Sequence, residues 1–554
     1  MNNLFAYPWF KLDQLNGFIV LAIGLFSILT LIYSLKFMQG KPQLLQYYTY
    51  IILTALASIG AVLANNLILL LVFWGFLGMT LYLLINMGQA GSEAVAKKTF
   101  IIVGGSDALM LLGIGIIYYL TGTFQMDNIK ITLNSFHDPL VALAYLCIAI
   151  AAFAKAGAMP FHSWIPDCAQ NAPIPVVAYL LASLDKLLGI YLLARISLNL
   201  FVMDETMNLL LMLVGAFTIM AAVMMALVQH NMKRLLGYCA VSQVGYMVLG
   251  IGTGNLIGIA GGILHMLNHA LYKSCLFFTA GNVEYKTKTS ELDELGGLAK
   301  AMPITYVCCL IASLSISGVP PFNGFVSKWL VYQGLIERLT TGGHHLAVGL
   351  CLLAAMFGSA LTLASFMKLL HATFLGKPAH NQTIRQVNDV PWQMWLPVVI
   401  LALTCVKFGI FSQQIPIRFY IAPLLGSITF IGTWYAGLAT LLVIVGLISG
   451  FLIFKLKELR PVIRQDTTFI GGETYDLEET RITGTEFYNT VKEIWILKII
   501  YNKAQAGFFD IYEQGKRLVF GIGGFFQYLH NGILPTYLVW TLLGMIALFF
   551  LLLR

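Results

Sequence analysis

Three titratable residues recur at regular spacing inside one apolar stretch of the chain. His265, His269 and Lys273 occur in GGILHMLNHALYKSCLFF, and residues four apart share one face of an α-helix. Histidine titrates near neutral pH, and burial lowers the proton affinity of lysine toward that range. The spacing predicts a ladder for proton transfer. Hydrogen bonding between helices is the alternative, and a metal site fits poorly because HMLNH lacks the glutamate of the HExxH pattern.

Other ionisable residues also interrupt apolar stretches. Asp107 lies in IIVGGSDALMLLGIG, Lys155 ends LAYLCIAIAAFAK, and Asp185 and Lys186 are central in AYLLASLDKLLGIYLLAR. Lys328 follows a proline-rich segment. Even lenient scales give a cost of about 2.5–3.5 kcal/mol for a charge at the centre of a bilayer, so each residue is a candidate for ion transport.

Simpler structural roles exist for these residues as well. Adjacent helical residues point about 100° apart, so Asp185 and Lys186 are not expected to face one channel together. Either could instead form an ion pair that holds two helices together. Lys155 and Lys328 could extend from a helix end to the membrane surface.

The composition defines the elements that position these residues. Charged residues make up only 10% of the 554 residues, hydrophobic residues make up 58%, and the mean hydropathy is +0.81. In a typical soluble globular protein, charged residues make up roughly a quarter of the chain. These values exclude a cytosolic enzyme, a nucleic-acid binder and a disordered scaffold. They predict an all-α polytopic membrane protein.

Apolar runs long enough to cross a membrane suggest about fourteen spans. Five lie in residues 48–196 and five in 207–375, and we expect these ranges to be two inverted repeats. A first helix is expected in 1–47 and is retained because the sequence lacks signal-peptide features. Further helices are expected in 376–455, a loop and an amphipathic lateral helix in 456–530, and a final span in 531–554.

Two spans are interrupted by proline and glycine. The interruptions are Ala154–Pro175 and Ile316–Lys328, each in the fourth span of its repeat. A proline leaves a backbone carbonyl unsatisfied, so a break of this kind persists only where protein or a wet cavity surrounds it. Each break carries a lysine, Lys155 or Lys328, which links the breaks to the ionisable residues above.

The distribution of basic residues predicts an orientation. Alternate connections place eleven lysines and arginines on one side and five on the other, and the richer side is expected to be cytoplasmic, with both termini outside. The richer set is Lys36, Lys41, Lys97, Lys98, Lys233, Arg234, Lys286, Lys288, Lys300, Lys377 and Arg385.

Apolar residues at helical spacing from Phe487 to Tyr501 predict the lateral helix, either a lipid anchor or a brace against a neighbouring subunit.

Five motifs in order resemble the antiporter-like subunits of respiratory complex I, of membrane-bound hydrogenases and of Mrp-type cation/proton antiporters. They are AKAGAMPFHSWIPDCAQNAPIPVVAYL, HNMKRLLGYCAVSQVGYMVLGIG, LHMLNHALYKSCLFFTAGNV, ELDELGGLAKAMP and GVPPFNGFVSK. The resemblance covers about residues 48–375. The FIGGE segment and the amphipathic C-terminal region resemble hydrogenase-type members more closely.

The resemblance implies roles for particular residues. Lys155 and Lys328 match the two broken-helix lysines of the family, and Asp107 matches a carboxylate that faces the first. His265, His269 and Lys273 match the central relay, and Lys233 matches a lysine near the start of a neighbouring helix. Together with Asp185 and Lys186, these residues are the expected path for ions along the membrane midplane.

The chain also departs from the family pattern. Gly75 stands where the family usually has a glutamate after the tryptophan, and Leu181 stands where many larger members have a histidine. Trp329 follows the second broken-helix lysine, where some members have an acid. We therefore expect Asp107, together with Asp185, to supply the counter-charge of Lys155.

The predicted function is movement of H⁺ or Na⁺ across a bacterial or archaeal inner membrane, as one subunit of a redox-driven complex I-like or hydrogenase-type assembly. The eight cysteines form no CxxC pair, so iron–sulfur, NiFe or flavin groups are expected only in partner subunits. The alternatives are a stand-alone Mrp-type antiporter subunit and a membrane partner of an inorganic-carbon uptake complex.

Overall fold

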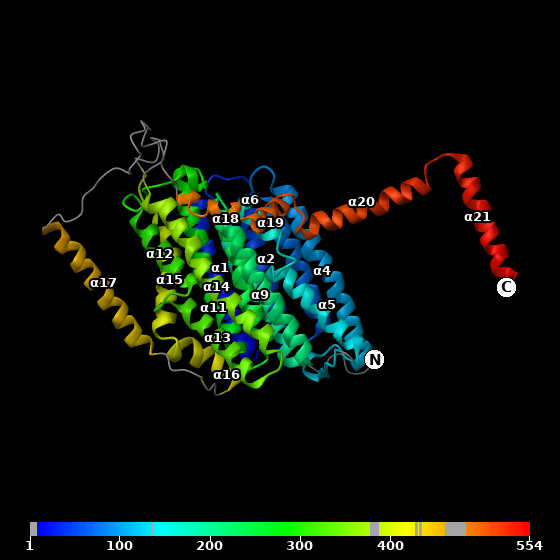
Figure 1. Cartoon of the computed structure of the whole chain (residues 1–554), viewed down its shortest axis with the longest axis horizontal. Coiled ribbons are helices and arrows are strands. Elements are labelled where there is room, and N and C mark those ends of the chain that lie inside the picture. The colour runs from blue at the N-terminus through cyan, green and yellow to red at the C-terminus, as the bar shows by residue number, and fades with distance from the viewer. Residues whose placement is uncertain are drawn as a thin grey trace. The chain divides into compact units, whose positions relative to one another are not determined.

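A computed structural model describes residues 8–135, 137–376, 387–426, 430, 435–459 and 484–553. The chain forms two compact units, Met1–Ile494 and Trp495–Arg554. Helices dominate both units (Figure 1). Lys377, Arg385 and the FIGGE segment, which entered the sequence predictions, lie outside the described residues.

The first part of the large unit contains six long helical segments. After α1 (Gln14–Phe37) come α2 (Leu44–Leu63), α3 (Leu67–Asn86), α4 (Ser92–Thr121), η1 (Met126–Asn128), β1 (Ile131–Thr132), α5 (Pro139–Ala156), α6 (Trp164–Asn171), α7 (Ile174–Val176), η2 (Val177–Leu184), α8 (Asp185–Arg195), η3 (Ile196–Leu200) and β2 (Phe201–Val202). The two short strands pair in parallel, with Ile131 opposite Phe201.

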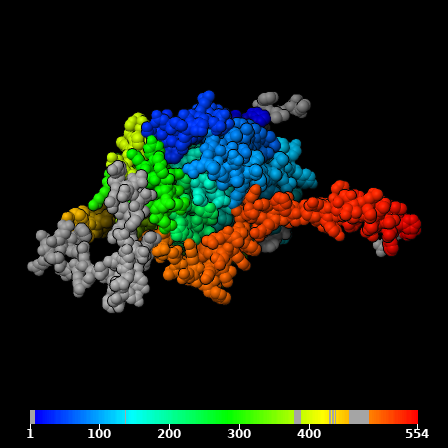
Figure 2. Space-filling view, turned by 90° about the horizontal axis from the view of Figure 1, so that it is seen from above, coloured from blue at the N-terminus to red at the C-terminus, as the bar shows by residue number. Residues whose placement is uncertain are grey.

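The rest of the large unit is also helical. It contains α9 (Glu205–Leu227), α10 (Met232–Gly252), α11 (Leu256–Thr287), η4 (Leu292–Glu294), α12 (Pro303–Ser317), α13 (Asn323–Thr341), α14 (His345–Leu370), η5 (His371–Leu375), α15 (Trp392–Ile410), η7 (Gln413–Ile421), α16 (Ala422–Leu425), α17 (Ala436–Leu459), η8 (Gly484–Glu486) and α18 (Asn489–Glu493). In a view from above, the blue N-terminal helices lie beside the green second half (Figure 2).

Polar residues fix where several of these helices begin. The Asp13 side chain accepts hydrogen bonds from the backbone N–H groups of Leu15 and Asn16 at the start of α1. Asn66, Asn231 and Asn255 cap α3, α10 and α11 in the same manner. Because a side-chain oxygen satisfies N–H groups that have no partner within the helix, these residues set the boundaries of the spans.

Within the described residues, eleven helices are long and apolar enough to cross a membrane. Pro303–Ser317 and Gly437–Ile453 are shorter apolar helices. The chain is thus an all-helical, multi-pass membrane protein. Both predicted interruptions are present, because α5 ends at Ala156 and α12 ends at Ser317, before α6 and α13 begin.

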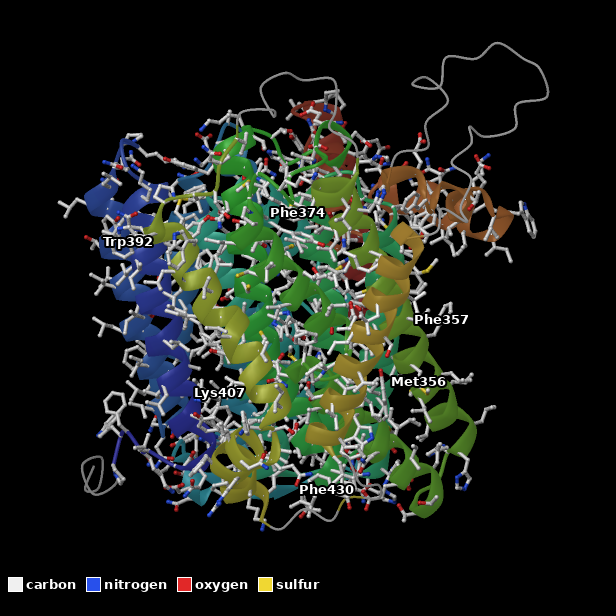
Figure 3. All side chains as sticks on the ribbon, turned by 90° about the vertical axis from the view of Figure 1, so that its left-hand side faces the viewer. Met356, Phe357, Phe374, Trp392, Lys407 and Phe430 are labelled. Carbon is white, nitrogen blue, oxygen red and sulfur yellow. The ribbon has the colours of Figure 1, made fainter. Side chains whose placement is uncertain are left out.

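Burial separates the centre of the large unit from its perimeter. Every residue from Ile257 to Val283 of α11 is buried, as is every residue from Leu235 to Gly252 of α10. On α14, Met356 and Phe357 point away from the bundle and are more than half exposed (Figure 3). The perimeter therefore presents the apolar surface that lipid requires, and α10 and α11 form the interior.

The helix expected from Phe487 to Tyr501 is not continuous. Its residues are divided between α18 and α19 (Trp495–Gln505), and Ile494 between them is not helical. The small unit holds α19, α20 (Ile511–Leu529) and α21 (Leu534–Leu552), and Gly507 follows α19 with a φ of +72°. Apolar periodicity predicted the helical segments but not the breaks between them.

Candidate functional site

The first interruption brings Lys155 to a helix end inside the bundle. Gly157 ends α5 with a φ of +83°, a left-handed conformation that glycine adopts readily. A Cβ atom on Gly157 would lie only 1.8 Å from Cδ1 of Ile165, so α6 packs directly on this turn. Lys155 is 0% exposed. It therefore does not extend to the membrane surface.

Two acids and an aromatic ring surround Lys155. Its Nζ atom lies 4.8 Å from the ring centre of Trp74 on α3 and has no hydrogen-bond partner. Its charge interacts with Asp185 on α8 and with Asp107 on α4. Asp107 faces α3, where a Cβ atom on Gly78 would lie 3.7 Å from its Oδ2. Both predicted acids therefore act electrostatically on Lys155, and their role as its counter-charges in transport stays a prediction.

Asp185 and Lys186 begin α8, directly after the π-helical segment η2. Both are buried, and neither Asp185 Oδ2 nor Lys186 Nζ has a hydrogen-bond partner. Lys186 Nζ lies 5.4 Å from the ring centre of Trp164 and would lie 3.8 Å from a Cβ atom on Gly157. The interior of the first half therefore holds two lysines and two aspartates.

The second interruption holds its lysine differently. Gly318 ends α12 with a φ of +79°, and Lys328 on α13 reaches back to donate a hydrogen bond of 2.8 Å to the carbonyl of Ile316. Its Nζ lies 4.6 Å from the ring centre of Tyr246. Among the described residues, no carboxylate contributes to its electrostatic surroundings. A helix C-terminus and an aromatic face both attract a cation, so they take the place of an acid.

A network of neutral groups closes the second interruption. Asn323 Nδ2 donates to Asn268 Oδ1 at 3.0 Å, and Asn268 Nδ2 donates to the Asn323 carbonyl at 2.8 Å. Ser315 donates to the Asn323 side chain, and Asn268 also donates to Ser327 at 3.2 Å. These bonds connect α11, α12 and α13 around the break.

The three residues of the predicted ladder are all buried on α11. His265 Nδ1 lies 2.8 Å from Ser327 Oγ, and its Nε2 lies 3.2 Å from Gln243 Oε1. His269 and Lys273 have no hydrogen-bond partner on their side-chain nitrogens. Buried polar groups without a partner within the protein are rare and often mark functional sites.

Electrostatic interactions connect the candidate residues in a continuous order. Lys155 interacts with Asp185, and Asp185 interacts with Lys186. Lys186 interacts in turn with His269 and Lys273. The series continues from His269 to His265 and from His265 to Lys328. All of these residues are buried.

Lys233 lies at the start of α10, apart from the midplane residues. Its Nζ forms an ion pair of 3.1 Å with Oε1 of Glu284 on α11. Glu284 was not among the residues predicted from the sequence. Glu284 lies eleven residues after Lys273, outside the short motif that drew attention to the ladder. Its place on the same helix, α11, could have indicated it.

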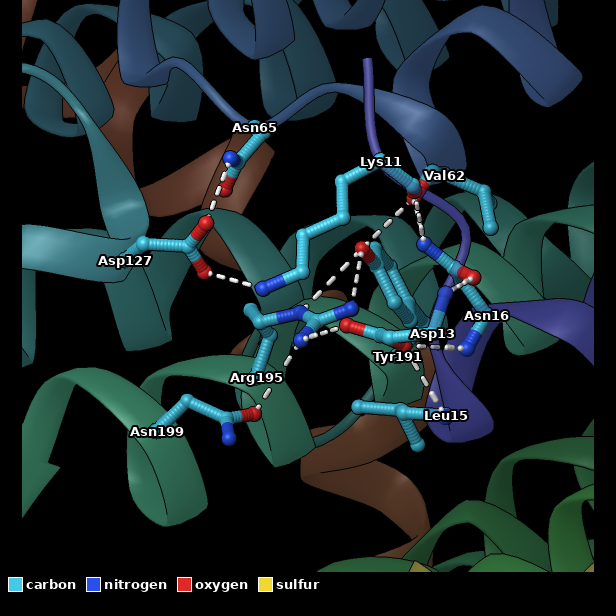
Figure 4. Close-up of polar contacts among 10 residues, drawn as sticks. All are labelled: Lys11, Asp13, Leu15, Asn16, Val62, Asn65, Asp127, Tyr191, Arg195 and Asn199. Carbon is cyan, nitrogen blue, oxygen red and sulfur yellow. Dashed lines mark hydrogen bonds and ion pairs between the residues drawn. The ribbon is translucent and has the colours of Figure 1, made fainter. Parts of the chain in front are cut away.

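The opposite end of the bundle carries a separate polar cluster (Figure 4). Arg195 donates to Asp13 at 2.7 Å, and Lys11 donates to Asp127 at 2.7 Å. Burial alone would raise the pKa of Asp13, but the hydrogen bond and charge of Arg195, with two backbone amides, hold it below its usual range. A cavity of about 360 Å³ lies among these residues. The cluster ties the start of α1 to the end of α8.

Several residues that contact the candidate groups were not predicted from the sequence. Trp74, Trp164 and Tyr246 each place a ring beside a buried lysine.

Gly75, where the family glutamate is missing, is exposed, and a Cβ atom there would meet nothing within 4 Å. No group of three potential metal ligands occurs in the part of the chain that the structure describes.

Comparison with known proteins gives a family. The profile described as "NADH:quinone oxidoreductase/Mrp antiporter, TM" matches residues 64–358, more than half of the chain. The chain belongs to this family. The resemblance seen in the five sequence motifs is thereby confirmed.

Individual relatives come from two branches of the family. The chain is 30% identical over 427 residues to NADH-quinone oxidoreductase subunit N of Desulforudis audaxviator, which covers 74% of this chain and 83% of that protein. It is 32% identical over 421 residues to Na(+)/H(+) antiporter subunit A1 of Staphylococcus haemolyticus, covering 72% of this chain. The match spans only 52% of that antiporter subunit.

Two solved structures share the fold. A chain of the membrane-bound sulfane sulfur reductase, an archaeal respiratory membrane complex, superimposes with a TM-score of 0.79 at 22% identity, over 99% of this chain and 90% of that chain. A chain of the Mrp complex from Dietzia gives a TM-score of 0.67 at 22% identity, over 75% and 84%. Both solved chains come from multi-subunit membrane complexes.

Proposed function

We propose that this chain moves H⁺, or Na⁺, across a bacterial or archaeal inner membrane as one subunit of a redox-driven complex I-like or hydrogenase-type assembly. The observation that supports this most strongly is the buried series from Lys155 through Asp185, Lys186, His269 and His265 to Lys328. Titratable groups inside a membrane bundle are costly and mark an ion path.

In this proposal each half passes a proton by changing the surroundings of its lysine. A carboxylate that approaches a buried lysine stabilises the ammonium form, and each pKa unit corresponds to about 1.36 kcal/mol. Movement of Asp107 or Asp185 relative to Lys155 would therefore load or release its proton. His265, His269 and Lys273 would carry the proton between the halves, and the interrupted helices would be the moving elements.

We further propose the finer features predicted from the sequence. Residues 48–196 and 207–375 are the two inverted repeats within about fourteen spans, the lysine-rich end is cytoplasmic, and both termini are outside. Iron–sulfur, NiFe or flavin groups belong to partner subunits. The fold matches that of a chain of the sulfane sulfur reductase complex over nearly all of this chain's length. This match supports a respiratory assembly.

A second candidate is exchange of Na⁺ for H⁺ as a subunit of an Mrp-type antiporter. The 32% identity to the antiporter subunit A1 supports it. The two candidates differ in whether transport requires electron transfer. Identification of the subunits that co-purify with the native chain would separate them.

The relay is tested by Lys155→Ala and Lys328→Ala in the intact complex, with ion uptake into membrane vesicles measured per turnover. Each variant should abolish most uptake, because each removes a buried proton-binding group from the series. Lys97→Ala is a matched control, since Lys97 is exposed. Unchanged uptake per turnover in both interior variants would refute the relay.

A further inference from the structure

A cavity of about 380 Å³ opens at the lysine-rich end of the bundle. Its walls come from the ends of α1 and α3 at Phe37 and Asn86, from the segment between α6 and α7 at Pro173, and from Lys41. Lys233 and Glu284 complete it. Elements of both halves therefore meet around one space beside the first interrupted span.

The Glu284 carboxylate is only half satisfied. Its Oε1 accepts from Lys233 Nζ at 3.1 Å, whereas its Oε2 is buried and has no hydrogen-bond partner. The side chains of Lys233 and Glu284 are 5% and 17% exposed. A carboxylate accepts up to about four hydrogen bonds, so a buried oxygen without any partner is a strong site for a proton or a water.

A neighbouring ion pair at the same end shows what a purely structural carboxylate looks like. Asp167 uses both oxygens, with Lys98 Nζ at 2.7 Å from Oδ2 and Arg234 at 3.2 Å from Oδ1. The second oxygen of Glu284 has no hydrogen-bond partner, although the charge of Lys41, which also lines the cavity, interacts with the carboxylate. One oxygen of Glu284 can therefore still accept a hydrogen bond or a proton. An ion pair that served only to join α10 and α11 would be expected to use both oxygens.

Glu284 also continues the stripe of the ladder along α11. It lies eleven residues after Lys273, which is about three turns, so the two side chains point within about 20° of each other and about 16 Å apart along the axis. Phe277 and Ala280 occupy the same face between them. The helix thus carries titratable groups on one line from the cavity to the bundle interior.

We propose that this cavity is the entrance for protons from the lysine-rich face, and that Glu284, held by Lys233, is the group that loads them. A hydronium ion in the cavity transfers its proton to the free oxygen of Glu284 and leaves as water. Neutralised Glu284 no longer holds the Lys233 ammonium, and the proton then passes toward Lys273. The inference rests on the transport function proposed above and names where transport begins.

The cavity itself can be tested without transport. The eight native cysteines are buried, so Glu284→Cys supplies a single addressable thiol. A membrane-impermeant maleimide applied to sealed vesicles should modify this variant from one side of the membrane only. Absence of modification from both sides would show that water does not reach the site, and would overturn the inference.

Transport measurements separate this inference from the function itself. Glu284→Gln should slow proton uptake roughly tenfold or more, as loss of a positioned proton-transfer group does, and Glu284→Asp should restore much of the rate because it keeps a carboxylate. Glu294→Gln, at an exposed site beyond α11, should leave uptake unchanged. If Glu284→Gln shows wild-type uptake while Lys328→Ala stops uptake, Glu284 is not the loading group. The proposed relay would then remain supported.

Discussion

Gly318→Ala tests whether the turn at the second interruption holds Lys328 in place. Gly318 has a φ of +79°, and an L-residue in this left-handed region costs about 1–2 kcal/mol. The added Cβ would lie 3.0 Å from Cδ of Lys328, which must shift away. That shift loosens the hydrogen bond of 2.8 Å from Lys328 to Ile316. A hydrogen bond from a charged group contributes about 1.5–3 kcal/mol, so backbone strain together with loss of this bond should cost about 2.5–5 kcal/mol.

The assay is thermal unfolding of the purified complex, combined with ion uptake in vesicles. Gly105→Ala is the matched control, because Gly105 lies within α4 and a Cβ atom there meets nothing within 4 Å. Alanine at a helix interior should stabilise by about 0.5–1 kcal/mol. In a Lys328→Met background, Gly318→Ala should cost only the backbone strain, and the difference measures the coupling to Lys328. Equal effects of Gly318→Ala in both backgrounds would refute the reasoning.

Two further predictions concern the first half. Asp107→Asn should impair ion uptake more than Asp127→Asn or Asp204→Asn, because Asp107 is the one residue of these three whose charge interacts with Lys155. Equal losses in the three variants would count against Asp107 as a counter-charge. Asp13→Asn should lower the thermal midpoint at pH 7. Because the pKa of Asp13 in the folded chain lies below its ordinary value of 3.8, its stabilisation is present above pH 3.8 and is lost as the pH falls through the folded pKa. The difference between wild type and Asp13→Asn should therefore vanish in acid, and a difference independent of pH would contradict the pairing with Arg195.

The sequence predicted the bundle and its interruptions because lipid imposes long apolar runs that proline and glycine visibly break. The stripe on α11 was also predictable, since it depends only on spacing within one helix. The apolar runs suggested about fourteen spans, and the described residues contain eleven helices that are long and apolar enough to cross a membrane.

Contacts between distant helices were not predictable in this way. Trp74 precedes Lys155 by 81 residues, and nothing in the local sequence indicates that its ring covers the lysine. The π-helical segment η2, which directly precedes Asp185 and Lys186, was not predicted either, because no local signal in the sequence marks a π-helix. The division at Ile494 lacks a proline or glycine to mark it.

The two interruptions hold their lysines with different chemistry, and this limits how each can be switched. Asp107 and Asp185 can each gain a proton, so a change in acidity alone can release Lys155. The carbonyl of Ile316 and the ring of Tyr246 keep the same charge throughout the physiological range. In the proposed relay, Lys155 can therefore respond to protonation of its neighbouring acids, whereas Lys328 can be released only by losing its own proton or by movement of a half-helix.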